Sequence, residues 1–218
     1  MRLLALASAG AFACAILSAC DFDGSGLEIV PKFDDRFSFE TDADMEEWDA
    51  RGLDLDDPPI TWEIARSTEQ ATEGAHAVRF RLDNLNDQGK IWIERRYEVA
   101  PDQESGVTIT FDLVTPDFGT VHLWRRLAGA APDAPMTAAD LISSLDTGNG
   151  EPSDVGFQTV EKTVTVLTKS DEDGEMFVYV GIWGTSEFSR TYYVDDLHAV
   201  FMRGGLSAPS GPSPTAVF

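Results

Sequence analysis

The chain has 218 residues, 43% of them hydrophobic, and a formal net charge of −22 at pH 7. This apolar content, together with five tryptophans, predicts a folded body rather than a disordered acidic chain. The negative charge repels nucleic-acid phosphates and anionic lipid headgroups, so we expect no nucleic-acid partner. A role in solubility explains most of the carboxylates. Some of them can also bind cations, calcium above all.

Residues 1–19 differ from the rest of the chain and have the pattern of an export signal. Arg2 gives a positive start, residues 3–16 are almost wholly apolar, and residues 17–19 (LSA) lead into Cys20. The apolar run is shorter than the roughly 20 residues of a membrane span, so we predict a cleaved secretory signal. Its ending resembles the lipobox of bacterial lipoproteins. That resemblance implies that Cys20 carries lipid, becomes the first residue of the mature chain and anchors it to the bilayer.

The alternative is an ordinary cleaved signal followed by a chance cysteine. The second cysteine, Cys14, lies within the predicted signal, so the mature chain has no partner for an internal disulfide. After the cut we predict a lipidated cysteine and flexible tether at 20–32, a folded body at 33–203, and a disordered Gly-, Ser- and Pro-rich tail at 204–218. We therefore expect an extracytoplasmic protein of the bacterial cell envelope, facing the periplasm or the surface.

Alternation of apolar and polar residues predicts that the body is made of strands. The predicted strands cover 77–82, 91–99, 107–113, 121–127, 160–167, 177–183 and 192–201. Turn signals rich in Asp, Glu, Ser and Gly separate several of them, at 87–89, 104–106 and 171–174. Many short strands with regular turns favour an all-β sandwich or barrel.

One segment departs from this pattern. Residues 128–156 are rich in Ala, Pro, Asp and Gly, and Thr137 to Asp140 resembles a capping box, followed by apolar residues at helical spacing over 141–145. We predict a helix of one or two turns inside a long loop insertion. Long loops on all-β scaffolds often carry function. The alternative is a surface insertion that packs its own small apolar face.

Three ordered groups of residues resemble a known class of domain. They are FSFE at 37–40 with EEW at 46–48, WEIA at 62–65 with ATEGAHAVRF at 71–80, and YYVDDL at 192–197. This order resembles the jelly-roll carbohydrate-binding modules of galactose-binding-like architecture. The resemblance implies a jelly-roll β-sandwich of two antiparallel sheets, packing roles for Trp48 and Trp62, and glycan as ligand. The insertion after residue 128 departs from the compact pattern and leaves the ligand open.

The same resemblance implies a structural calcium ion. In such sandwiches the first and last strands are neighbours, which brings together Glu40, the turn at Glu73 and the pair Asp195 and Asp196. Calcium takes six to eight oxygen ligands. The implied site uses Glu40, Glu73 and one of Asp195 or Asp196, with backbone oxygens nearby. The alternative is that these acids are solvated or cap turns.

Sugar recognition uses aromatic faces with polar groups around them. The candidates in predicted strands are Trp92, Trp124 and Trp183, and Arg126 lies close to Trp124, just before the insertion. A tryptophan in a strand can equally belong to the core. The arginine pairs at 95–96 and 125–126 could clamp a carboxylated sugar or balance acids on neighbouring strands.

No catalytic motif stands out. The three histidines, His76, His122 and His198, lie far apart, and there is neither a Gly-x-Ser-x-Gly elbow nor a phosphate loop. We therefore expect a protein that is not an enzyme, although a carboxylate pair for glycoside hydrolysis remains open. The leading hypothesis is a membrane-anchored binding module for glycan, with a structural calcium. The alternative is a structural or assembly lipoprotein of the envelope that binds another protein.

Overall fold

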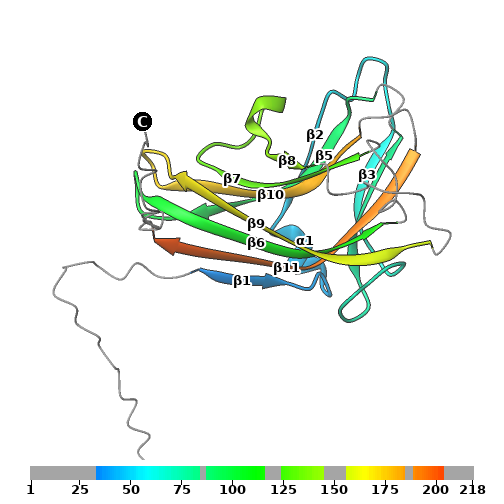
Figure 1. Ribbon diagram of the computed structural model, residues 1–218, viewed down its shortest axis with the longest axis horizontal. Coiled ribbons are helices and arrows are strands. Elements are labelled where there is room, and N and C mark those ends of the chain that lie inside the picture. Colours follow the sequence, from blue (N-terminus) through cyan, green and yellow to red (C-terminus); the bar gives the residue numbers. More distant parts are fainter. Residues whose placement is uncertain (1–32, 84–86, 116–123, 145–155, 185–188, 204–218) are drawn as a thin grey trace, which may run out of the picture. The chain divides into compact units, whose positions relative to one another are not determined.

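The computed structural model describes residues 33–83, 87–115, 124–144, 156–184 and 189–203 (Figure 1). The predicted signal, Cys20, the tether and the tail lie outside these ranges. By its internal contacts the chain divides into residues 1–30 and residues 31–218, and every described residue belongs to the second unit. Within the described ranges, no helix combines the length and the apolar character that a membrane crossing needs.

The first of two antiparallel sheets has six strands. Their order is β3 (Trp62–Ser67), β4 (Ala77–Asp83), β11 (Ser189–Arg203), β6 (Glu104–Thr115) and β9 (Gln158–Lys169), with β1 (Asp34–Phe37) also on β11. β4 pairs with residues 189–194 of β11, and β1 pairs with residues 197–200. The first and last strands are therefore neighbours, as the resemblance implies.

The second sheet has five strands. Their order is β2 (Asp49–Leu53), β5 (Lys90–Glu98), β10 (Glu175–Gly184), β7 (Trp124–Ala131) and β8 (Ser143–Ser144). The two sheets lie face to face as two layers (Figure 1). This arrangement confirms the predicted all-β sandwich of two antiparallel sheets.

Side chains from both sheets form one apolar core between the layers. Its large aromatic members are Phe37, Phe39, Trp48, Phe80, Tyr97, Phe111, Trp124, Tyr192 and Phe201. Trp48 packs edge-on against Phe37, with ring centroids 5.2 Å apart, so its predicted packing role is confirmed. The packing role predicted for Trp62 is wrong, because this residue is 40% exposed. Trp62 opens an edge strand, where the core has ended.

Two short helical segments interrupt the strands. The predicted helix in the insertion is a single 3₁₀ turn, η1 (Ala138–Asp140). The Asp140 carboxylate accepts hydrogen bonds from the backbone N–H groups of Thr137 (2.8 Å) and Met136 (3.1 Å), which lowers the pKa of Asp140. A second helix, α1 (Asp42–Glu46), was not predicted, although Thr41 and Asp44 form a reciprocal capping box at its start.

The insertion also begins later than predicted. β7 continues to Ala131, so only residues after 131 leave the sheet. Ala128 and Ala130 are buried in the core between the sheets. Gly129 lies under the Tyr179 ring, where an added Cβ would come within 2.5 Å of the phenol oxygen. Small residues here permit a strand whose composition resembles that of a loop.

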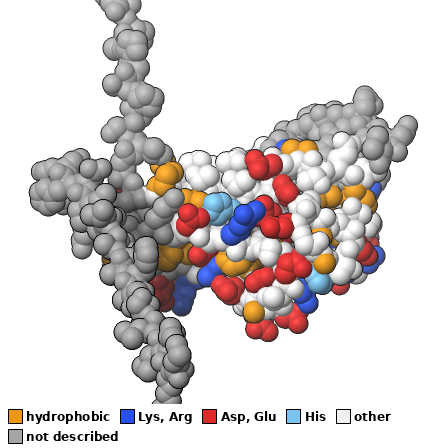
Figure 2. All heavy atoms as spheres, turned by 90° about the horizontal axis from the view of Figure 1, so that it is seen from below, with side chains coloured by type: hydrophobic (Ala, Val, Ile, Leu, Met, Phe, Trp, Pro, Cys, Tyr) orange, Lys and Arg blue, Asp and Glu red, His pale blue; other side chains and the backbone are white. Residues whose placement is uncertain are grey.

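The surface is dominated by carboxylates that surround isolated basic side chains. Figure 2 shows this pattern on the face that carries β1. Arg95 contacts Glu47 (2.7 Å) and Asp35 (3.2 Å), and Arg66 contacts Asp42 (2.6 Å). Exposed pairs of this kind contribute only about 0–1 kcal/mol each to stability. Ion pairs do, however, occupy most of the arginine and lysine side chains that the structure describes.

Candidate functional site

The outer face of the five-stranded sheet carries a groove. Strand alternation points Ile91 and Ile93 of β5 into the core and turns Lys90, Trp92 and Glu94 to the opposite face. The strand register then places Arg51 of β2, Trp92 of β5, Gly181 of β10, Leu127 of β7 and Ser143 of β8 in one row across this face. The insertion with η1 stands over the same face (Figure 1).

The insertion is fastened to this face by a second apolar cluster. The cluster consists of the buried residues Trp92, Leu127, Leu141 and Tyr179. The Tyr179 hydroxyl accepts a hydrogen bond from the backbone N–H of Ile142 (2.8 Å) and donates one to the carbonyl of Asp140 (3.2 Å). Burial raises the pKa of Tyr179. The insertion thus packs on the sheet and forms one wall of the groove.

The groove has a volume of about 330 Å³ and lies between β2, β5 and the start of the insertion. Its lining residues are Arg51, Gly52, Leu53, Trp92, Glu94, Ala134, Pro135 and Met136. This volume is at the lower end of the range of about 300–1,000 Å³ found for small-molecule sites. Met136 is 75% exposed at the rim. The lining therefore combines apolar surface with a single charged pair.

That charged pair is held rigidly. Glu94 is only 2% exposed; its Oε1 accepts a hydrogen bond from Arg51 Nε and its Oε2 accepts one from Trp92 Nε1, both at 2.9 Å. The bond to Glu94 raises the pKa of Arg51. Arg51 remains half-exposed, so its other N–H groups are available to a ligand. No local sequence pattern indicates this pair, because Arg51 and Glu94 lie on strands far apart in the chain.

Trp183, a predicted ligand residue, lies on the same face but is already covered by cations. Lys90 Nζ lies 4.3 Å from the centroid of its ring, and the guanidinium carbon of Arg125 lies 4.9 Å from it. Lys90 is itself buried and donates to Asp54 (2.5 Å) and to the Gln88 carbonyl (2.7 Å). The Trp183 ring is thus engaged within the protein.

Trp124 and Arg126, two further predicted ligand residues, point the other way. β7 begins at Trp124, and its alternation turns both residues inward. Trp124 is 0% exposed and packs on Tyr192, with ring centroids 5.1 Å apart. Arg126 is also buried. Their placement does not fit the predicted contact with a ligand. Of the four predicted ligand residues, Trp92 is the one that lines the groove.

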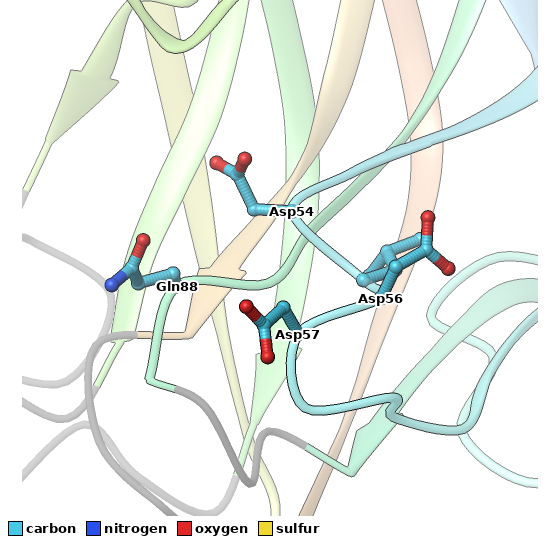
Figure 3. Close-up of a pocket in the computed structure, with 5 residues that line it drawn as sticks. Asp54, Asp56, Asp57 and Gln88 are labelled. Atoms are coloured by element: carbon cyan, nitrogen blue, oxygen red, sulfur yellow. The ribbon is translucent and has the colours of Figure 1, made fainter.

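A second, acidic pocket lies beside Lys90. It has a volume of about 430 Å³ and is lined by Asp54, Leu55, Asp56, Asp57 and Gln88 (Figure 3). The three carboxylates point in different directions (Figure 3). Within the described ranges, no group of three or more His, Cys, Asp or Glu side chains is placed to hold a metal ion.

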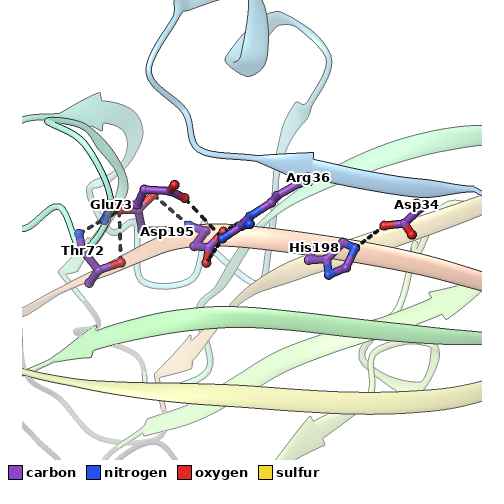
Figure 4. A network of polar contacts seen from close by, with 7 residues as sticks. Asp34, Arg36, Thr72, Glu73, Asp195 and His198 are labelled. Atoms are coloured by element: carbon purple, nitrogen blue, oxygen red, sulfur yellow. Dashed lines mark hydrogen bonds and ion pairs between the residues drawn. The ribbon is translucent and has the colours of Figure 1, made fainter.

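The four carboxylates of the implied calcium site do meet, at the loop formed by residues 72–76. Figure 4 shows Glu73 and Asp195 of this corner beside Arg36. Asp195 is 0% exposed; its Oδ2 accepts hydrogen bonds from the N–H groups of Thr72 (2.7 Å) and Glu73 (2.9 Å). Asp196 lies at a bulge in β11 with φ of 45°, and Arg36 donates two hydrogen bonds to it, at 2.5 and 2.7 Å. Arg36 also lies 3.5 Å from Glu73.

Glu40 holds the other end of this loop. Its Oε1 accepts hydrogen bonds from the N–H groups of Ala75 (2.8 Å) and His76 (2.9 Å), which lower the pKa of Glu40. The bond from Arg36 likewise lowers the pKa of Asp196. Calcium needs oxygen ligands, whereas here N–H donors and a guanidinium face the carboxylates. The donor set of this corner therefore does not fit a calcium ion.

The comparisons with known proteins give fold-level likenesses. No family model matches the chain, and no curated protein matches it. Among solved structures, the mannan-recognising carbohydrate-binding module TmCBM27 is 14% identical, with a TM-score of 0.48, over 80% of this chain and 99% of that one. The K3 cleaved adhesin domain of Lys-gingipain from Porphyromonas gingivalis is 14% identical, with a TM-score of 0.47, over 78% and 99%.

A third structure belongs to work on promiscuous carbohydrate-binding modules of the β-sandwich superfamily. It is 16% identical, with a TM-score of 0.45, and the match covers 74% of this chain and 59% of that one. These neighbours include β-sandwich carbohydrate-binding modules, the class of domain that the sequence resembles. All three TM-scores are below 0.5, so the ligand has to be argued from the residues of this protein.

Proposed function

We propose that the protein is an extracytoplasmic module, anchored by lipid on Cys20, that binds glycan in the groove over Arg51, Trp92 and Glu94. The observation that carries this proposal is the fixed Arg51–Glu94 pair beside apolar surface. A sugar ring presents apolar C–H groups on its faces and hydroxyls around its rim. The apolar lining can pack against the C–H groups, and the guanidinium donors and the carboxylate acceptor can hydrogen-bond the hydroxyls.

The geometry favours binding over catalysis. Glu94 is the only carboxylate among the described lining residues, whereas glycoside hydrolysis uses a pair. Both of its oxygens are held by protein donors. Such a carboxylate positions a neighbouring arginine rather than transferring a proton. Calcium has no part in this proposal, because the donors at the Glu40 and Asp195 corner do not fit it.

One observation favours the alternative, an envelope component that binds another protein. Met136 is 75% exposed and Ile142 is also exposed, and both lie in the insertion. The double substitution of Met136→Asp and Ile142→Asp would weaken the binding of a protein partner that docks there. Glycan binding in the groove depends instead on Arg51.

The test is a glycan array probed with the mature, lipidated protein in detergent. Arg51→Ala should reduce binding to any glycan hit by roughly tenfold or more, because a hydrogen bond to a charged group contributes about 1.5–3 kcal/mol. Arg96→Ala is the matched control, since Arg96 is an exposed arginine of β5 outside the groove that pairs with Glu175 at 2.7 Å. No binding to any glycan, or equal loss in both variants, would contradict the proposal.

A further inference from the structure

We propose a second site, separate from the groove, in which Trp62 and Arg81 bind an acidic sugar residue such as a hexuronate. The two residues line a pocket of about 430 Å³ together with Thr61 and Glu63. This pocket lies at the edge of the six-stranded sheet, whereas the groove lies on the five-stranded sheet. The inference therefore goes beyond the proposed function and does not depend on it.

Trp62 is the tryptophan that the fold leaves open. It is 40% exposed, while Trp48, Trp92 and Trp124 are each at most 5% exposed and Trp183 is covered by Lys90 and Arg125. A large exposed aromatic ring beside a pocket provides a flat surface on which the C–H face of a sugar ring can stack.

Arg81 is the cation that the fold leaves unpaired. Among the arginine and lysine side chains that the structure describes, every other one has a bonded or stacked partner, and Arg81 has none. In a chain of 38 acids and 16 lysines and arginines, such a free guanidinium is unexpected. It is exposed, and it lines the same pocket as Trp62.

The reason that Arg81 is free is visible in the strand register. Glu63 lies directly opposite Arg81, yet its carboxylate turns to Arg79 at 3.0 Å. Arg79 also contacts Glu69 at 3.4 Å, so one arginine satisfies two acids. The Arg81 fork is left for a ligand, and a guanidinium fork matches the geometry of a carboxylate.

Both residues are held by the backbone of paired strands. Trp62 lies opposite Leu82, the residue next to Arg81, so the two side chains leave the sheet on opposite faces. Both line the pocket at the end of this strand pair, where the N–H of Asp83 donates to the carbonyl of Thr61 at 2.9 Å. The backbone positions of both residues are therefore set before a ligand arrives, which lowers the entropy lost on binding. A ring with one apolar face and one carboxylate matches this pair, and a neutral sugar leaves the arginine unused.

The test compares a galacturonate oligosaccharide with a neutral galactose oligosaccharide of the same length. Binding to the full mature protein in detergent is followed by calorimetry and by the tryptophan fluorescence that Trp62→Phe removes. We expect the acidic oligosaccharide to bind more tightly, and Arg81→Gln to weaken it about three- to tenfold, the range between an exposed ion pair and a charged hydrogen bond. Arg81→Lys should restore only part of this loss, because an ammonium lacks the fork.

Trp62 lines this pocket and not the groove, so the fluorescence change that Trp62→Phe removes separates binding here from binding in the groove. Arg96→Gln is the matched control for loss of one exposed positive charge. Both Trp62 and Arg81 are exposed, so a thermal melt of each variant should match the wild type and confirm folding. Equal affinity for the two oligosaccharides, or wild-type binding by Arg81→Gln and Trp62→Ala, would overturn the proposal.

Discussion

Asp195→Ala is expected to be the most damaging single change at the corner where β1, β11 and the loop 72–76 meet. The buried Asp195 carboxylate accepts hydrogen bonds from the N–H groups of Thr72, Glu73 and Asp196 at 2.7–2.9 Å. Alanine removes all of these acceptors and leaves three backbone donors without a partner. The loop 72–76 then loses its attachment to the last strand.

The magnitude follows from these three donors. An unsatisfied buried N–H costs about 1–3 kcal/mol, and the part-buried position of this loop lets water offset some of the loss. We therefore expect a decrease of about 3–5 kcal/mol in the free energy of unfolding. For a domain of this size, one kcal/mol changes Tm by about 2–4 °C, so Tm should fall by about 6–20 °C.

The assay is a thermal melt of the mature protein, with Asp196→Asn as the control. Asp196 pairs with the exposed Arg36, and its loss should cost only about 0–1 kcal/mol. The wild type should melt at the same temperature with calcium and with chelator, because N–H donors rather than an ion satisfy these carboxylates. A control as damaging as Asp195→Ala, or a Tm that falls on chelation, would refute this reasoning.

Two further predictions concern the insertion and the acid response. Gly129→Val should displace Tyr179, because the phenol oxygen would lie 2.5 Å from the new Cβ. Tyr179 fastens the insertion, so amide hydrogen exchange in residues 132–144 should become faster. Unchanged exchange there would contradict the role of Tyr179. The folded-state pKa of Glu40 lies below its ordinary value of 4.5, so its stabilising effect is present above that pH and is lost as pH falls through the lowered pKa. The wild type should therefore exceed Glu40→Gln in denaturant stability near neutral pH and converge with it in acid, and a constant difference at all pH values would show that this ionisation is irrelevant.

Much of the sheet structure could be predicted from alternation. The strands later in the chain, such as β6 and β10, have long runs in which one face is apolar. β2 could not be found in this way, because its sequence DARGL lies at a sheet edge and buries no side chain. The first strands were expected only through the family resemblance. The end of β7 was missed because Ala and Gly residues resemble a loop in composition and fit a close-packed strand equally well.

The candidate site was harder to predict. Alternation indicates that Trp92 and Ile93 face opposite sides of a sheet, but it does not show which side is the core. The Arg51–Glu94 pair joins residues 43 positions apart, and no local pattern reports such a contact. The meeting of Glu40 with Asp195 and Asp196 at one loop was expected, but whether an ion or N–H groups would face them depends on backbone directions that the sequence does not contain.

The most direct test of glycan binding in the groove is a two-dimensional ¹H–¹⁵N spectrum of the five tryptophan indoles in the mature protein, with substitutions to assign each signal. The Trp92 Nε1–H donates to Glu94, so a glycan that contacts the Arg51–Glu94 pair must change its environment. On titration with a neutral glycan hit, we predict that the Trp92 signal moves while the signals of the buried Trp124 and of Trp62, which lies on the other sheet, stay. A saturable glycan titration in which the Trp92 signal does not move, or in which only the Trp62 signal moves, would contradict the proposed site.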